Sequence, residues 1–166
     1  MFKIDKDFKI HCSRGDAGTI TLKIPYVDNN GYIKYYEMDG LTEVVYWYDT
    51  QKKIMYDADY EVSTKTPEDL TLSYYQFQVG DKIKFNIYEK KGYDIEPLKS
   101  KIITIQSATY ECEIPLYEED TTFGDLSNKP ITYWYDITLN EDLTIICYNE
   151  EGAQEFIQYP AKGDEE

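Results

Sequence analysis

The sequence predicts an all-β fold, a β-sandwich or distorted barrel of about eight to ten short antiparallel strands. Apolar and polar residues alternate with a period of two through most of the chain, as they do in half-buried strands. Turn-forming residues separate the alternating runs at short intervals, and no longer stretch shows the 3.6-residue period of a helix. The chain of 166 residues also contains 18 tyrosines, which favour the pleated, half-buried surface of a sheet.

Four runs alternate most clearly: Thr19–Ile24, Lys82–Ile87, Tyr110–Leu116 and Ile131–Asn140. Every second side chain of a strand points to the same face, so each run has an apolar face for a core and a polar face for water. From the first two runs we expect one shared core made of Ile20, Leu22, Ile24, Ile83, Phe85 and Ile87.

Turn signals connect the runs. Asn30-Gly31 is typical of a tight hairpin, here between a run that ends at Val27 and one that begins at Tyr32. Asp49–Lys53 separates two further runs, 44–48 and 54–60, both rich in tyrosine.

The sequence predicts two more connections, a second hairpin near the C-terminus and one helical turn. Asn149–Gly152 predicts a hairpin between the runs Leu143–Tyr148 and Glu155–Tyr159. Thr66–Asp69 combines a capping residue, a proline and two acids, which predicts a single helical turn.

Two glycine turns are interpreted as structural. Arg14-Gly15-Asp16 also spells a tripeptide that integrins recognise, but glycine and aspartate at this place favour a turn before the strand at Thr19. Gly80-Asp81 in the same way precedes the strand that begins at Lys82.

The length fits a single β domain over residues 1–161, followed by a polar tail over 162–166. Residues from about 32 to 74 form the least regular part and are expected to be an insertion with its own hairpin.

The charge limits the partners. Asp and Glu number 32 against 17 Lys and Arg, which gives a formal charge of −15. This sign argues against nucleic acids and anionic membranes, and no stretch is apolar enough to be inserted in a bilayer. We see no signal peptide and expect a soluble chain made in the cytoplasm, with neutral or basic proteins or glycans as partners.

Catalytic signatures are missing. Cys12, Cys112 and Cys147 form no metal or redox motif, and His11 is the only histidine. The paired acids, among them Glu118-Glu119-Asp120, lie in predicted turns and are interpreted as solvated. We therefore expect no enzyme, no metal and no cofactor.

Aromatic triplets supply the candidate binding residues. Trp47 stands between Tyr46 and Tyr48, and Trp134 stands between two further tyrosines. Neighbours in a strand point to opposite faces, so each Trp faces away from its Tyr neighbours. One face belongs to a core and the other is a candidate contact surface for proteins or sugars.

Several segments resemble small tail-associated proteins of phages that infect Firmicutes. Arg14–Ile20 and Tyr75–Phe85 are similar to an RGD-x-G opening and an F-x-x-GD-x-I-x-F strand in the N-terminal domain of upper baseplate proteins. Tyr133–Asn140, Thr144–Tyr148 and Tyr159-Pro160 also look like these proteins.

The resemblance covers about two-thirds of the chain and does not extend to Tyr32–Tyr74, and Cys147 stands where the family would have Gly. It implies a β-sandwich in the virion that docks on copies of itself or on other virion proteins, and it implies no catalytic residues. The leading hypothesis is a non-enzymatic structural protein of the tail tip or baseplate. The alternatives are a glycan-binding module for a bacterial surface and an enzyme that acts on polysaccharide.

Overall fold

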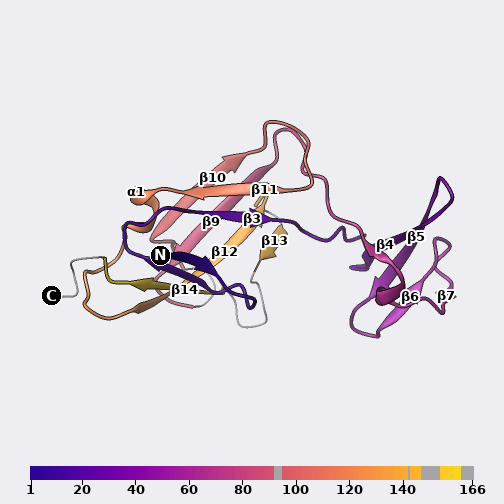
Figure 1. Ribbon diagram of the computed structural model, residues 1–166, viewed down its shortest axis with the longest axis horizontal. Helices are drawn as coiled ribbons and strands as arrows, with labels where there is room; N and C mark the ends of the chain where they lie inside the picture. The colour runs from indigo at the N-terminus through magenta and orange to yellow at the C-terminus, as the bar shows by residue number, and fades with distance from the viewer. Residues whose placement is uncertain (92–94, 142, 147–153, 162–166) are drawn as a thin grey trace. The chain divides into compact units, whose positions relative to one another are not determined.

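The computed structural model describes residues 1–91, 95–141, 143–146 and 154–161 (Figure 1). Strands make up 49% of it and helices 5%, so the all-β prediction is confirmed. The chain divides into two compact units. Unit 1 consists of Met1–Leu22 and Phe77–Glu166, and unit 2 consists of Lys23–Gln76.

Unit 1 contains a seven-stranded sheet in the order β1-β2-β14-β12-β9-β10, with β13 also paired to β12. Its strands are β1 (Phe2–Ile4), β2 (Ile10–Ser13), β9 (Lys82–Tyr88), β10 (Lys99–Thr104), β12 (Ile131–Leu139), β13 (Leu143–Ile146) and β14 (Gln154–Tyr159). All pairs are antiparallel except β14 and β2, which are parallel. The expectation of antiparallel strands alone is therefore wrong. β2 and β14 come from opposite ends of the chain, so no hairpin fixes their direction.

A second sheet of unit 1 pairs β3 (Gly18–Leu22) with β11 (Cys112–Leu116), and the short helix α1 (Glu118–Thr121) follows β11. In Figure 1 these two strands cross in front of the larger sheet. Ile20 of β3 and Tyr135 of β12 line the same cavity, which agrees with this placement.

The core of unit 1 is aromatic at its centre. The Phe85 ring lies 5.5 Å from the Tyr135 ring and 6.5 Å from the Phe156 ring, measured between centroids. Phe123 packs edge-on against Phe156 and Tyr133. Aliphatic residues surround these rings and are buried on both sheets: Ile10, Ile20, Leu22, Ile83, Ile87, Ile114, Leu116, Ile137 and Leu139.

The predicted core is correct except for one residue. All six predicted residues are buried, but Ile24 belongs to unit 2 and not to the core of unit 1. The chain leaves β3 at Leu22, and the main-chain carbonyl of Ile24 accepts a hydrogen bond from Tyr75 within unit 2. The apolar alternation continues past the point at which the sheet ends.

Two other local predictions differ from the structure. Tyr110 is exposed and precedes β11, which begins at Cys112. In the described residues β13 and β14 both pair with β12 and not with each other. The predicted turn at Asn149–Gly152, Cys147 and the tail at 162–166 lie outside the described residues.

Unit 2 contains a five-stranded antiparallel sheet in the order β7-β6-β5-β4-β8. Its elements are β4 (Ile33–Asp39), β5 (Thr42–Asp49), β6 (Ile54–Tyr56), β7 (Val62–Ser63), the single 3₁₀ turn η1 (Pro67–Asp69) and β8 (Thr71–Leu72). The expected insertion, at about 32–74, falls inside this unit. The described residues form fourteen strands, more than the eight to ten expected, because strands of two or three residues are too short to show alternation.

The turns of unit 2 follow local chemistry. Asp49 accepts hydrogen bonds from the main-chain N–H groups of Gln51 and Lys52, which closes the predicted turn between β5 and β6. Thr66 and Asp69 form a capping box around η1, so the predicted helical turn is confirmed.

Candidate interaction surface

Aromatic side chains of unit 2 gather on one face of its sheet. The register sets Trp47 of β5 opposite Lys34 of β4 and opposite Tyr56 of β6. Residues directly opposite one another in a sheet share a face. Tyrosines from the adjoining turns complete the group. We call this set the aromatic face, and it consists of Tyr26, Tyr32, Trp47, Tyr56 and Tyr60, with Lys34 at its edge.

The rings form a continuous chain of contacts. The Trp47 ring is nearly parallel to the Tyr60 ring, with centroids 6.1 Å apart and an angle of 6° between the planes. Tyr26 approaches Trp47 at the same centroid distance and a tilt of 46°. Tyr32 joins Tyr60, at 6.5 Å, to Tyr56, at 5.3 Å. Aromatic pairs at these distances add to the stability of a cluster beyond the area that they bury.

Two aspartate turns place the outer tyrosines. Asp28 Oδ1 accepts two main-chain N–H hydrogen bonds within its own turn, at 2.9 Å each. Asp57 Oδ1 accepts two in the next turn, at 2.9 and 3.0 Å. Tyr60 has a φ of +62°, and its hydroxyl donates to Asp28 Oδ2 at 3.0 Å, which links the two turns. The two turns and this hydrogen bond together fix the position of the Tyr60 ring.

The aromatic face combines apolar area with polar groups. Tyr60 is 46% exposed and Tyr26 40%, while Trp47 is half-buried between them. The hydrogen bond to Asp28 raises the pKa of Tyr60, and reduced solvation raises the pKa of Tyr32, so both phenols stay neutral near neutral pH. The Lys34 ammonium lies 5.4 Å from the centre of the Tyr26 ring. Such a surface can stack on flat or apolar groups and exchange hydrogen bonds at its rim.

The structure separates the four predicted contact residues. Tyr46 and Tyr48 point to the opposite face of the unit 2 sheet from Trp47. Tyr46 is buried, and its hydroxyl donates to Glu37 Oε1 at 2.8 Å. That hydrogen bond raises the pKa of Tyr46 and lowers the pKa of Glu37. Tyr48 packs edge-on against Tyr35.

Trp134 belongs to β12 of unit 1 and is half-buried. The Lys91 ammonium lies 5.1 Å from the centre of its ring. Of the four predicted residues, only Trp47 therefore belongs to the aromatic face, and the sequence reasoning missed its partners Tyr26, Tyr32, Tyr56 and Tyr60.

The first predicted turn, Arg14-Gly15-Asp16, lies between β2 and β3. Arg14 Nη1 donates to the main-chain carbonyls of Phe123 and Gly124, at 2.5 and 3.2 Å. Gly15 has a φ of +83°, and the carbonyl of Asp16 accepts a hydrogen bond from Thr121 Oγ1 at 2.7 Å.

The second predicted turn, Gly80-Asp81, precedes β9. Gly80 has a φ of +93°, and its N–H donates to the carbonyl of Ile105. Asp81 Oδ2 accepts the main-chain N–H of Gln78 at 2.8 Å, and Asp81 Oδ1 accepts Asn140 Nδ2 at 3.1 Å. Both oxygens thus hold the chain at the start of β9.

Gly80→Val is expected to lower the free energy of unfolding by about 1–2 kcal/mol, because a β-branched residue is strained at positive φ. No atom lies within 4 Å of a Cβ placed there, so the loss would come from the backbone alone. Urea denaturation measures it, and Gly80→Asn is the control, since asparagine tolerates this conformation better. Equal losses for both variants would contradict the explanation.

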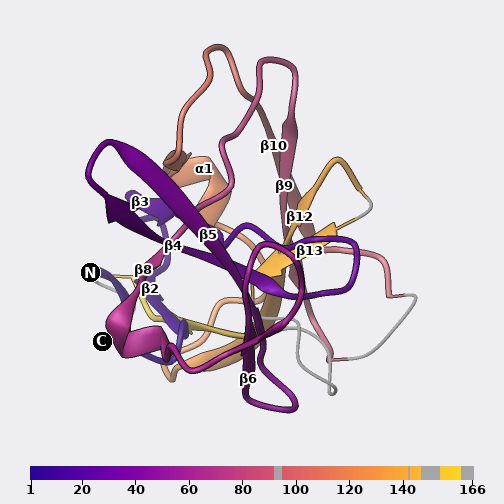
Figure 2. The same cartoon turned by 90° about the vertical axis from the view of Figure 1, so that its right-hand side faces the viewer.

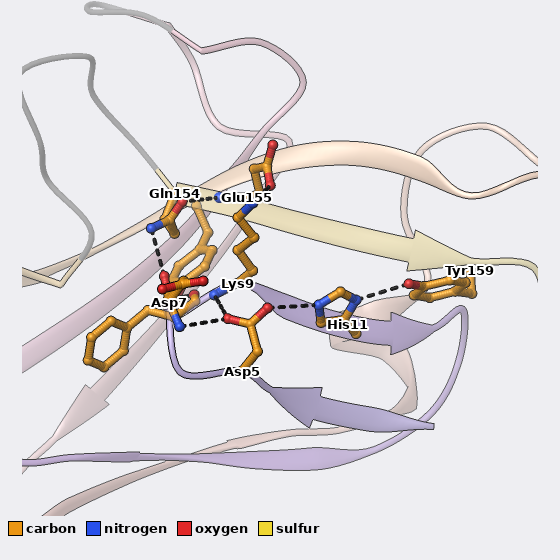
Figure 3. A network of polar contacts seen from close by, with 9 residues as sticks. Asp5, Asp7, Lys9, His11, Gln154, Glu155 and Tyr159 are labelled. Carbon is orange, nitrogen blue, oxygen red and sulfur yellow. Dashed lines mark hydrogen bonds and ion pairs between the residues drawn. The ribbon is translucent and has the colours of Figure 1, made fainter.

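The only histidine lies in a closed polar network (Figure 3). His11 Nε2 lies 3.1 Å from Asp5 Oδ2, and His11 Nδ1 lies 2.9 Å from the Tyr159 hydroxyl. Asp5 Oδ1 accepts two main-chain N–H groups, and hydrogen bonding to His11 lowers the pKa of Asp5. Lys9 pairs with Glu155 of β14 at 2.9 Å. Both ring nitrogens have partners within the protein, and the network joins the β1–β2 hairpin to β14.

The buried cysteines and Asp120 have structural roles in unit 1. Cys12 and Cys112 are buried free thiols, and burial raises the pKa of Cys12 to about 11. The expectation that all three acids of Glu118-Glu119-Asp120 are solvated is wrong for Asp120. It is half-buried and lies 2.6 Å from the Lys101 ammonium, because α1 turns it toward β10. The pair Glu150-Glu151 lies outside the described residues.

Within the described ranges, no three His, Cys, Asp or Glu side chains are grouped so that they could hold a metal ion. In the same ranges, no helix is both long enough and apolar enough to cross a membrane. No family model, no curated protein and no solved structure matches this chain.

Proposed function

We propose that this chain is a non-enzymatic structural protein of a phage virion, at the tail tip or baseplate, and that unit 2 binds a neighbouring virion protein through the aromatic face. The observation that carries the binding role is the partly exposed stack of Tyr26, Trp47 and Tyr60. The placement in a phage particle comes from the resemblance of the sequence segments.

Composition supports a contact role for unit 2. It holds ten of the 18 tyrosines in 54 residues. Tyrosine and tryptophan are enriched at protein interfaces, where a few such residues contribute most of the binding energy. Unit 2 also has ten acidic residues against five lysines, which favours a neutral or basic partner.

For unit 1 we propose a β-sandwich frame, in which the β3–β11 pair covers the seven-stranded sheet. Buried residues on alternate positions of β3, β11, β9 and β12 support this arrangement. Two sheets with apolar inner faces form such a layered core. In this proposal unit 1 is the scaffold and unit 2 carries the contact.

Tyr60→Ala is expected to weaken retention of the virion partner about 30-fold, which corresponds to about 2 kcal/mol for an interface anchor. The immobilised chain is incubated with a phage lysate, and retained proteins are identified and quantified by mass spectrometry. Tyr110→Ala is the matched control, because Tyr110 is a comparably exposed tyrosine of unit 1. Equal retention by wild type and Tyr60→Ala would contradict the proposal.

A second candidate function is recognition of a bacterial surface glycan. It is favoured by the Tyr60 hydroxyl and the Asp28 carboxylate, which lie beside stacked rings. Sugars bind to such combinations of ring faces and hydrogen-bonding groups. A glycan array probed with the chain, alone and assembled, tests this function, and the absence of binding in both forms would remove it.

A further inference from the structure

The strand β10 is the longest strand with an open edge in the seven-stranded sheet, within the described part of the molecule. It pairs with β9 along all six residues, and no other described strand pairs with it. Figure 2 shows β10 beside β9. The other strands with an unpaired side in the described residues are shorter, or contain Gly18 or Pro115: β13 has four residues, β1, β7 and β8 have three or fewer, and β3 and β11 contain the glycine and the proline. Short strands and prolines are common means of blocking an edge.

The main-chain hydrogen bonds around β9 show which residues of β10 face the open side. The N–H of Ile105 donates to Asp81, so it points toward the β9 side of the strand. The N–H and C=O of Lys82 bond to Asn140, which lies on the β12 side of β9. In an antiparallel pair the main-chain N–H and C=O groups of every second residue point to the same side. Like those of Ile105, the main-chain groups of Lys101 and Ile103, which pair with Phe85 and Ile83, therefore point toward β9. The main-chain groups on the open side belong to the alternate residues Ser100, Ile102 and Thr104.

The centre of this open edge is apolar. Ile102 is 57% exposed in the middle of the strand, and β10 contains neither proline nor glycine. Its two lysines are bound by their own chain, since Lys99 Nζ donates to the Glu119 carbonyl and Lys101 Nζ to Asp120 Oδ2. An exposed edge strand with an apolar centre favours the addition of another strand.

We propose that two copies of this chain pair through β10, in an antiparallel arrangement centred on Ile102. This inference rests on the proposed role in assembly and names a second contact besides the aromatic face. Centring on Ile102 sets Ser100 opposite Thr104 of the second copy, so all three outward residues form hydrogen-bonded pairs. It also sets Lys101 opposite Ile103 and Lys99 opposite Ile105. No two like charges are directly opposite.

Local charge favours a second copy over a chain of other composition. A groove of about 350 Å³ lies beside the end of β10 and is lined by Ile103, Ile105, Glu111 and Glu113 among others. Antiparallel pairing brings Lys99 of the second copy to the Ile105 end of this groove. Both glutamates are exposed, and the Lys99 ammonium, which donates to the Glu119 carbonyl of its own chain, has further N–H groups to donate to them. The attraction acts twice, once at each end, and opposes the repulsion between two chains of charge −15.

Sedimentation velocity of the full chain, over a concentration series, tests the pairing. Wild type is expected to form a dimer. Ile102→Lys should raise its dissociation constant about tenfold or more, because two ammonium groups then face each other across the two-fold axis. Leu126→Lys is the matched control, since Leu126 is 74% exposed outside the strands. It makes the same change of charge and should leave the dissociation constant within about twofold of the wild-type value.

Amide hydrogen exchange gives a readout that does not depend on a variant. Exchange at Ser100, Ile102 and Thr104 should slow as wild type dimerises. A monomer at every concentration, or a dimer unaffected by Ile102→Lys, overturns the pairing. If the chain does not dimerise through β10 but still retains virion proteins in a way that depends on Tyr60, only the pairing is overturned and the proposed function stands. If the chain dimerises through β10 but retains no virion protein, the pairing is supported and the virion role is overturned.

Discussion

Phe85→Ala is expected to lower the free energy of unfolding of unit 1 by about 3–5 kcal/mol. Phe85 is 1% exposed and lies between the Tyr135 and Phe156 rings. The loss combines the transfer energy of the ring with the cavity that remains, since neighbours on the paired strands β12 and β14 cannot all move into the space.

Urea denaturation measures this change most clearly in a Trp47→Phe background. Trp134 is then the only tryptophan and reports on unit 1 by its fluorescence. Leu126→Ala, at an exposed position, is the control and should change stability by less than about 0.5 kcal/mol. A loss below about 1 kcal/mol for Phe85→Ala would show that the buried face of β9 is assigned wrongly.

Lys101→Met is expected to cost about 2–3 kcal/mol of stability, because it leaves the Asp120 carboxylate without its charged partner. The side chains of Lys101 and Asp120 are only 17% and 13% exposed. Methionine keeps most of the apolar stem, so the loss reports the charge. Lys129→Met makes the same change at an exposed lysine and should be nearly neutral.

The pH dependence gives an independent check. Burial tends to raise the pKa of Asp120, but the hydrogen bonds from Lys101 and from the main chain of Tyr117 outweigh it and lower the pKa. A carboxyl with a lowered folded-state pKa contributes stability above its unfolded-state pKa and loses it as pH falls through the folded-state value. The difference between wild type and Lys101→Met should therefore shrink in acid. A difference that stays constant to low pH would contradict the role of the ion pair.

Strands with strong alternation were predictable because a strand with one buried face has an apolar residue at every second position. β9 and β12 follow the expected runs, and their apolar faces are buried except at Ile131, which is half-buried; Asn86 of β9 is buried as well, which the alternation does not predict. The same alternation gives no sign of where a sheet ends, so Ile24 was placed in the wrong unit. The parallel pairing of β2 with β14 joins distant parts of the chain and leaves no local pattern.

The candidate surface was predictable only in part. The pleat indicates that Trp47 faces away from Tyr46 and Tyr48, and the register agrees. The stacking of Tyr60 on Trp47 depends instead on a positive φ and on a hydrogen bond to a distant aspartate. Asp120 was missed for a similar reason, since its partner Lys101 lies on another strand. These contacts join residues that are far apart in the sequence, so the local alternation of apolar and polar residues does not predict them.

We propose above all that this chain is a structural component of a phage particle. Negative-stain electron microscopy of particles labelled with a gold-conjugated antibody to the chain tests it most directly. Particles that lack the chain, prepared in the same way, are the control for the antibody. The account predicts gold at one fixed place on the tail tip or baseplate. Diffuse label, with no particle association above the control, would contradict it.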